Sequence, residues 1–365
     1  MIAVLREVSG VVDRRFFLNA LLPSLLFCSL GVAVVVAGRP EPALRTWSTS
    51  TAEVRALLVF GFAALVMMLA IVVSNQRASV LRWFEGYWSS PVGRVAARIG
   101  CRYHGKRHRQ LVTLVEGGDN RAYEILELSY PPATRPDQVM PTRLGNLLKS
   151  AELYPLTRYS IDAVLTWPRL YHLLPDRFLA AFSAARADLD MMLGLSCLSA
   201  LFSAGSAVYL LVVGGPWGWY LTCLWGGALV GYLSYRSALG AAAVYGHQIR
   251  VAFDLYRDAL RERLGDQPES NGDDERNYWE RLGLFWYRGI PRDHAMTQAD
   301  AGGLPRLLRQ VLTTWEHREG AQLPAEPVGK APAQRAVVLP LSVWLHTVVV
   351  LSGIVGAVLL GSGLS

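Results

Sequence analysis

The feature that most constrains this chain is a run of 45 residues, Met191 to Tyr235, that contains no Asp, Glu, Lys, Arg or His. As a helix rising about 1.5 Å per residue it would be roughly 67 Å long, enough to cross a hydrocarbon core of about 30 Å twice. Gly214 to Pro216 interrupt the run near its middle, and Trp217 follows. Gly and Pro end helices, and Trp prefers the membrane interface. The run therefore predicts a transmembrane helical hairpin, with a helix pair in a soluble core as the alternative.

The composition agrees with a membrane setting. Only 18% of the 365 residues are charged, below the roughly 25% that is usual for soluble proteins. The four cysteines show no paired spacing, which argues against a disulfide framework.

Three further apolar segments are long enough to span a membrane. The first, 16–38, resembles a signal peptide in its flanking residues, but its apolar core exceeds the usual length of about 7–15 residues, which favours an uncleaved span. The predicted organisation is a cytoplasmic N-terminus 1–15, spans 16–38 and 56–76, a basic helical cytoplasmic segment 77–190, spans 191–213 and 217–236, a cytoplasmic segment 237–335 and a last span 336–361.

The charge distribution predicts the orientation of these spans. Segment 77–190 carries sixteen basic and eleven acidic residues, and Arg and Lys near span ends stay cytoplasmic. The N-terminus is then cytoplasmic, whereas the 39–55 loop, the hairpin tip and the C-terminus lie outside. The predicted fold class is an all-α integral membrane protein with about five transmembrane helices and a helical cytoplasmic domain.

A basic row follows the second span. Its members recur every four residues, as on one face of a helix: they are Arg94, Arg98, Arg102 and Lys106. This spacing predicts a basic amphipathic helix at anionic lipid headgroups. The alternative is a solvated face that only enforces orientation. Nucleic acid is not expected as a partner, because the patch is short, lies near the membrane and belongs to no recognisable binding module.

The rest of the cytoplasmic part is also predicted to be helical. A helix opening at Pro141 is expected to end at Tyr154-Pro155, and both hairpin arms are expected to extend beyond the membrane as antiparallel helices. Residues 266–276 read as a polar linker. The aromatic group that follows is expected to pack on these helices, or, in the sharper alternative, to dock a protein partner: Tyr278, Trp279, Phe285, Trp286 and Tyr287.

Motifs for catalysis or phosphate binding are lacking, so no enzymatic activity and no cofactor are predicted. The weak candidate for a metal site is the set Cys101, His104 and His108, at i, i+3 and i+7 of one helix. Four basic residues surround these three and would repel a divalent cation, so no metal is predicted there.

Two ionisable residues are functional candidates because they fall in apolar surroundings. His346 lies within the last predicted span, where a neutral histidine bonded to a neighbouring helix is the alternative to a proton relay. Asp162 opens an apolar segment, and a structural ion pair with Arg158 or Arg169 is the alternative to a functional acid.

Small residues recur every four positions in both hairpin arms. Ser199 and Ser203 lie in the first arm, and Gly227 and Gly231 form a Gly-x-x-x-Gly pair in the second. Such residues either pack helices closely or, where hydroxyls face an axis, line a pore. Both interpretations stay open at this point.

The segment containing Pro-Thr-Arg-Leu-Gly-Asn (141–146) and Trp-Pro-Arg-Leu (167–170) resembles a group of bacterial multi-pass membrane proteins of no known activity. This resemblance implies a bacterial inner membrane and assigns no functional residue. The order of spans also resembles bestrophin channels in topology, although the fifth span departs from that plan. The leading hypothesis is a non-enzymatic, channel-like homo-oligomer that passes ions or small solutes. The alternative is a membrane-anchored scaffold that recruits a cytoplasmic protein.

Overall fold

All regular secondary structure is helical in the part of the chain that the computed structural model describes, residues 16–266 and 272–288. The all-α prediction is therefore confirmed for these residues. The last predicted span, 336–361, and His346 within it lie outside the described residues.

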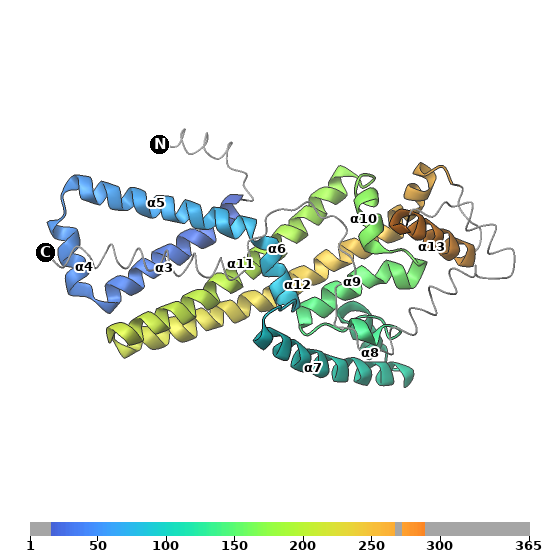
Figure 1. The fold of residues 1–365 in the computed structure, drawn as a ribbon, viewed down its shortest axis with the longest axis horizontal. Helices are drawn as coiled ribbons and strands as arrows, with labels where there is room; N and C mark the ends of the chain where they lie inside the picture. Colours follow the sequence, from blue (N-terminus) through green and yellow to red (C-terminus); the bar gives the residue numbers. More distant parts are fainter. Residues whose placement is uncertain (1–15, 267–271, 289–365) are drawn as a thin grey trace. The chain divides into compact units, whose positions relative to one another are not determined.

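Short connections join the helices, which Figure 1 colours along the sequence. In order they are η1 (Phe17–Leu21), α3 (Leu22–Gly38), α4 (Pro40–Thr49), α5 (Ala52–Asn75), α6 (Arg77–Glu85), α7 (Pro91–Glu116), α8 (Asn120–Ser129), η2 (Pro136–Gln138), α9 (Arg143–Tyr159), α10 (Ala163–Tyr171), α11 (Asp176–Val213), α12 (Trp217–Arg263) and α13 (Gly272–Arg288). The helices divide between two compact units. The first unit contains residues 16–150 and 176–248 among those described, and the second contains 151–175, 249–266 and 272–288.

Three helices are long and apolar enough to cross a membrane: Asn19–Gly38, Ala52–Asn75 and Asp176–Val213. They contain or overlap the first three predicted spans. Their outward faces remain apolar, as Leu57 and Phe60 of α5 show with exposed fractions of 69% and 73%. Contiguous exposure of this kind marks a surface covered by lipid or by another protein. These helices indicate a membrane protein.

The fourth predicted span, 217–236, is a helix but is not among those three. Its sequence contains Trp, Tyr and Gly in place of aliphatic side chains. Trp and Tyr prefer the membrane interface, and Gly contributes little apolar surface. Its place in a bilayer therefore stays a prediction.

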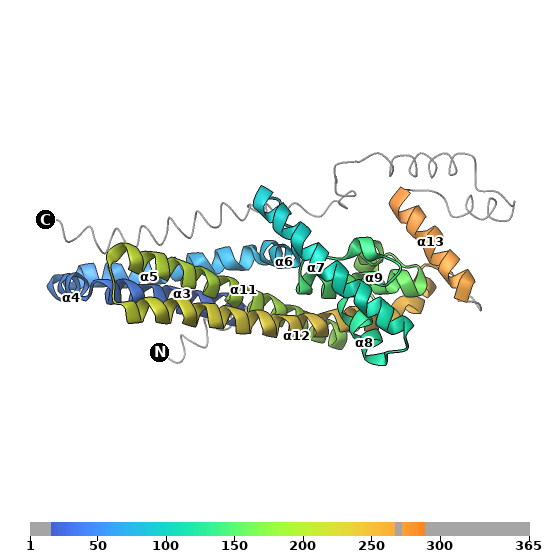
Figure 2. The ribbon, with the colours of Figure 1, turned by 90° about the horizontal axis from the view of Figure 1, so that it is seen from below.

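The helical hairpin of the first unit is formed by α11 and α12, which lie side by side in Figures 1 and 2. They meet at Gly214–Pro216, where the sequence predicts the turn. Gly214 has φ +71°, a left-handed conformation that glycine adopts without steric cost. The amide of Gly215 then donates to the carbonyl of Leu210 at 2.9 Å, which ends α11.

Apolar packing joins the other membrane helices to this hairpin. One cluster brings α3 and α5 against α11 through Cys28, Val66, Leu69, Val73 and Leu198. Nearer the hairpin tip, Val34 of α3 packs with Leu210 and Cys223. Where charged residues begin on the arms, a third cluster adds α6 and the start of α9: Val80, Leu81, Leu144, Leu147, Leu189, Leu193, Ala238 and Ala242.

The end of α9 differs from the prediction. The helix does not stop at Tyr154-Pro155 but continues to Tyr159. Pro155 has no N–H to donate, which normally weakens a helix interior, yet the next turn is held from outside because Tyr154 and Tyr159 both bond to α12. The helix ends only where the amide of Ile161 donates to the carbonyl of Pro155 at 3.1 Å.

The 39–55 connection contains a helix, α4, which begins at Pro40.

Candidate functional site

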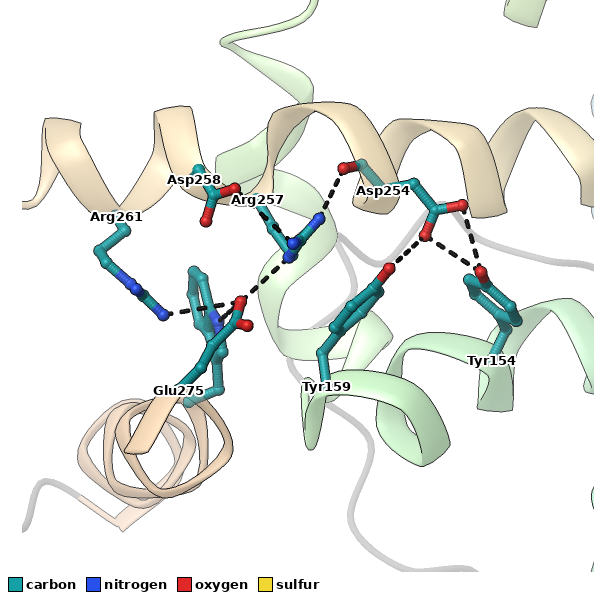
Figure 3. Close-up of polar contacts among 8 residues, drawn as sticks. Tyr154, Tyr159, Asp254, Arg257, Asp258, Arg261 and Glu275 are labelled. Carbon is teal, nitrogen blue, oxygen red and sulfur yellow. Dashed lines mark hydrogen bonds and ion pairs between the residues drawn. The ribbon is translucent and has the colours of Figure 1, made fainter. Parts of the chain in front are cut away.

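The second unit contains a cluster of charged and aromatic side chains that we call the charged clasp. Its members come from the last turns of α9, the end of α12 and the first turn of α13, and Figure 3 shows them pointing toward one another. They are Tyr154, Tyr159, Asp254, Arg257, Asp258, Arg261 and Glu275. The four α12 residues fall at positions i, i+3, i+4 and i+7, so that one helix face presents all of them.

Asp254 holds the α9 side of the clasp. Its carboxylate accepts hydrogen bonds from the hydroxyl of Tyr159 at 2.8 Å and from that of Tyr154 at 3.1 Å. Burial raises the pKa of Tyr159 to about 12, with the hydrogen bond to Asp254 and its charge adding to the effect. Burial, and then the charge of Asp254, also raises the pKa of Tyr154. Both hydroxyls therefore stay protonated donors at neutral pH.

Glu275 holds the α13 side. Its Oε1 lies 3.0 Å from Nε of Arg257 and 3.6 Å from Nη2 of Arg261. Arg257 also donates from Nη1 to the backbone carbonyl of Asp254 at 2.6 Å, and Asp258 lies 3.7 Å from its Nη2. Two guanidinium groups thus converge on one carboxylate oxygen, which ties the first turn of α13 to α12.

Arg261 is the most buried charged side chain described, with 1% of its surface exposed. Its Nε and Nη2 make no hydrogen bond within residues 16–266 and 272–288. The guanidinium instead lies over the rings of Tyr278 and Trp279, 4.7 Å and 5.6 Å from their centroids. Aromatic faces and the Glu275 charge partly offset the large cost of removing this cation from water.

The chemistry of the clasp favours positioning over catalysis. Asp254 accepts from tyrosines, Glu275 and Asp258 lie beside arginines, and the clasp contains no histidine or cysteine. A general base needs a group poised to accept a proton near the working pH, and each of these carboxylates is already engaged by tyrosine or arginine side chains. What the arrangement does is fix α9, α12 and α13 against one another.

The sequence did not predict this clasp. The residues it joins are 95 to 100 positions apart in the Tyr–Asp bonds, and no local pattern reports such a pairing. The available signal was the alternation of acid and base at 254, 257, 258 and 261 on one face of a helix.

The predicted small residues of the hairpin lie together between its two arms. A Cβ added to Gly227 would come 2.8 Å from Cβ of Ser203, and one added to Gly231 would come 3.6 Å from Cβ of Ser199. Ser203 donates from Oγ to the carbonyl of Leu224 at 2.6 Å. Ser196, which the sequence did not single out, donates in the same way to the carbonyl of Gly231 at 2.9 Å.

These contacts assign the four small residues to packing within one chain. Glycine at the crossing lets the backbones approach, and the hydroxyls of Ser196 and Ser203 donate to carbonyls of the opposite arm. The pore interpretation of these small residues stays a prediction.

The predicted lipid-headgroup residues Arg94, Arg98, Arg102 and Lys106 are all exposed on α7. Asp162 is exposed as well and serves as the N-cap of α10, accepting from the amides of Val164 at 2.8 Å and Leu165 at 3.1 Å. Arg169, a predicted ion-pair partner, places its guanidinium 4.1 Å from the ring centroid of Trp286.

The candidate metal ligands do not converge. Cys101 approaches the carbonyl of Val139, His104 bonds through Nδ1 to the hydroxyl of Tyr130 at 3.0 Å, and His108 bonds through Nε2 to a backbone carbonyl at 3.0 Å. Burial lowers the pKa of His104, and the charge of Arg143 adds to this effect. Each of the three side chains fastens α7 to the 130–139 loop, and the described residues contain no group of three metal-binding side chains.

No protein-family model, curated protein or solved structure matches the chain.

Proposed function

We propose that the protein is a membrane-anchored scaffold, in which candidate spans hold the chain in a bilayer and helices outside them form a docking platform for a protein partner. The observation that carries this proposal is the charged clasp. Burying charges is expensive, and its best-attested use is to specify one arrangement of helices. A platform for a partner needs such an arrangement at α13, whose exposed side includes Phe285 and Tyr287.

The membrane setting that we propose is the bacterial inner membrane, with five spans and the N-terminus in the cytoplasm. It is supported by the three apolar helices and by the basic excess of 77–190, which favours a cytoplasmic location.

The test uses full-length protein in cells, with a photo-crosslinking amino acid in place of Tyr287. The expected result is a defined crosslinked protein that is lost in Arg261→Ala, which removes a buried member of the clasp. It should be retained in Arg276→Gln, because Arg276 is 55% exposed on the same helix. Crosslinks unaffected by Arg261→Ala, or crosslinks only to lipid, contradict the scaffold.

A channel-like homo-oligomer is the second candidate, and a separate observation favours it. Gly218, Thr222 and Gly226 follow one another at four-residue intervals on an exposed side of α12. A Cβ added at Gly218 or Gly226 would meet nothing within 4 Å, so this small-residue face is available for a helix of another copy.

The channel is tested by reconstituting the purified protein in liposomes and measuring ion flux and oligomer size. Gly226→Leu is expected to reduce both, because it blocks close approach of a second helix. A monomeric protein without ion flux contradicts the channel hypothesis and is consistent with the scaffold.

A further inference from the structure

The outer face of α7 carries an apolar stripe that is open in the described structure. Val92, Val95, Ile99 and Tyr103 are spaced three or four residues apart and expose 81%, 54%, 61% and 68% of their surface. Residues at these intervals lie on one side of a helix. A helix face in water would carry polar side chains there.

This stripe is not the face that packs on the protein. The opposite side of α7 is already engaged: Gly100 lies against Pro141, His104 bonds to Tyr130, and Leu111 is buried in a cluster with α8. The helix therefore has two apolar sides, of which only one is covered by its own unit.

A basic row borders the stripe. Arg94, Arg98, Arg102 and Lys106 are exposed and stand four residues apart, a spacing at which like charges repel and destabilise a helix. The whole of α7 holds six basic residues and one acidic residue. An occupant that carries negative charge would relieve this repulsion, whereas a neutral or basic one would not.

The start of α7 lies beside an aromatic belt. Trp83 and Trp88 line a groove with Tyr232 and Tyr235 of α12, and Phe84 stacks on Tyr235 with 5.7 Å between ring centroids. Tyr235 is the last residue before Arg236, where charge reappears on the arm. Trp and Tyr gather at the headgroup level of a bilayer.

The first turn of α7 touches this belt. Gly93 packs so closely on Trp88 that a Cβ would not fit. The stripe therefore begins at the depth at which lipid headgroups would lie.

From these observations we infer that α7 lies on the membrane surface and binds its anionic lipid headgroups. The apolar stripe enters the interface, and the basic row contacts lipid phosphates, as in amphipathic helices that lie in the plane of a membrane. The inference rests on the membrane setting of the proposed function and not on its scaffold role.

The experiment places an environment-sensitive fluorescent amino acid at position 99 of the full-length protein, in phosphatidylcholine nanodiscs with or without phosphatidylglycerol. With phosphatidylglycerol, the emission is expected to shift to the blue and to be quenched by doxyl-labelled lipids. The same label at position 134, which is exposed within the 130–139 loop, should show neither change.

A matched pair of double variants tests the charge. Arg98→Gln with Arg102→Gln is expected to weaken the association of α7 with the surface by about 30-fold, at about tenfold per 1.4 kcal/mol and about 1 kcal/mol per basic residue. Arg121→Gln with Arg135→Gln removes the same charge from exposed positions outside the basic row and should leave quenching unchanged.

Three results overturn the inference. Emission at position 99 that stays water-like in both lipids means that the stripe remains in solvent. A blue shift without doxyl quenching means that protein, such as a second copy, covers it. Equal quenching with and without phosphatidylglycerol means that α7 does not need anionic headgroups to bind the membrane. A protein that fails to enter the discs at all would instead contradict the membrane setting.

Discussion

The hairpin of the first unit and the charged clasp of the second unit are both built on α12, yet they are held together by opposite chemistry. From 217 to 235 the helix has no charge and meets α11 through glycine, serine and backbone carbonyls. From 254 to 261 it presents two acids and two arginines to aromatic rings and a glutamate.

The membrane setting that we propose accounts for the difference. Lipid tails are as apolar as the side chains they would replace, so helices in a bilayer associate through close packing and a few hydrogen bonds. In water, the same helix is held by burying surface, and its charges can be paired as they are removed from solvent. In the proposed setting, α12 changes its mode of assembly at the point where it leaves the membrane.

The largest effect expected of this contrast is at Arg261. Its replacement by Ala leaves Glu275 with one cation and a cavity beneath Tyr278, and breaking a buried charge pair costs about 3 kcal/mol. Hydrogen exchange of α13 in the full-length protein should accelerate, while the hairpin amides stay protected. Arg276→Gln is the control, since its 4.0 Å pair with Asp273 is exposed. Unchanged exchange in Arg261→Ala would mean that the clasp does not hold α13.

Next in size is a test of the hairpin. Gly227→Leu would drive a side chain into Ser203, and overpacking of this kind costs about 2 kcal/mol. The detergent-solubilised protein should unfold at lower temperature. Gly205→Leu is the matched control, because Gly205 is exposed on α11 and a Cβ there meets nothing within 4 Å. Equal destabilisation by the two variants would show that the arms do not pack as described.

A smaller effect on the clasp is expected from alkaline pH. The pKa of Tyr159 is about 12 in the folded protein, against about 10 when unfolded. Between these values the unfolded chain binds fewer protons, so the stability of the clasp falls as pH rises from about 10 to about 12. Circular dichroism melts should show this decline, and Tyr159→Phe should reduce it. A decline of the same size in Tyr159→Phe would exclude this tyrosine as its source.

The smallest effect belongs to a single hairpin hydroxyl. Ser203→Ala removes the bond to the carbonyl of Leu224, and bonds of this type contribute about 0.6 kcal/mol in membranes. Ser206→Ala is the control, because Ser206 donates to the carbonyl of Phe202 in its own helix. In detergent melts, Ser203→Ala should lower the unfolding temperature more than Ser206→Ala. A larger decrease in Ser206→Ala would contradict the importance of the bond between the two arms.

The sequence predicted the hairpin well because its signal is local. The absence of charge over 45 residues and the break at Gly214 to Pro216 can both be recognised within one short stretch of the chain. It placed the end of α9 wrongly, because a proline weakens a helix locally. The tyrosines before and after that proline are held by Asp254, which is far away in the sequence.

The clasp escaped prediction for the same reason. Its bonds join segments that only the tertiary fold brings together, and charge alternation on α12 is equally typical of a solvated face. The spacing of Cys101, His104 and His108 put them on one helix face, but the 130–139 loop gives each its own partner.

The apolar stripe of α7 has a practical consequence for anyone who cuts this protein into pieces. A fragment freed of the three apolar helices would still carry Val92, Val95, Ile99 and Tyr103 on its outside. It would self-associate and adsorb to surfaces in plain buffer, and its purification would require detergent or added lipid even though those three helices had been removed.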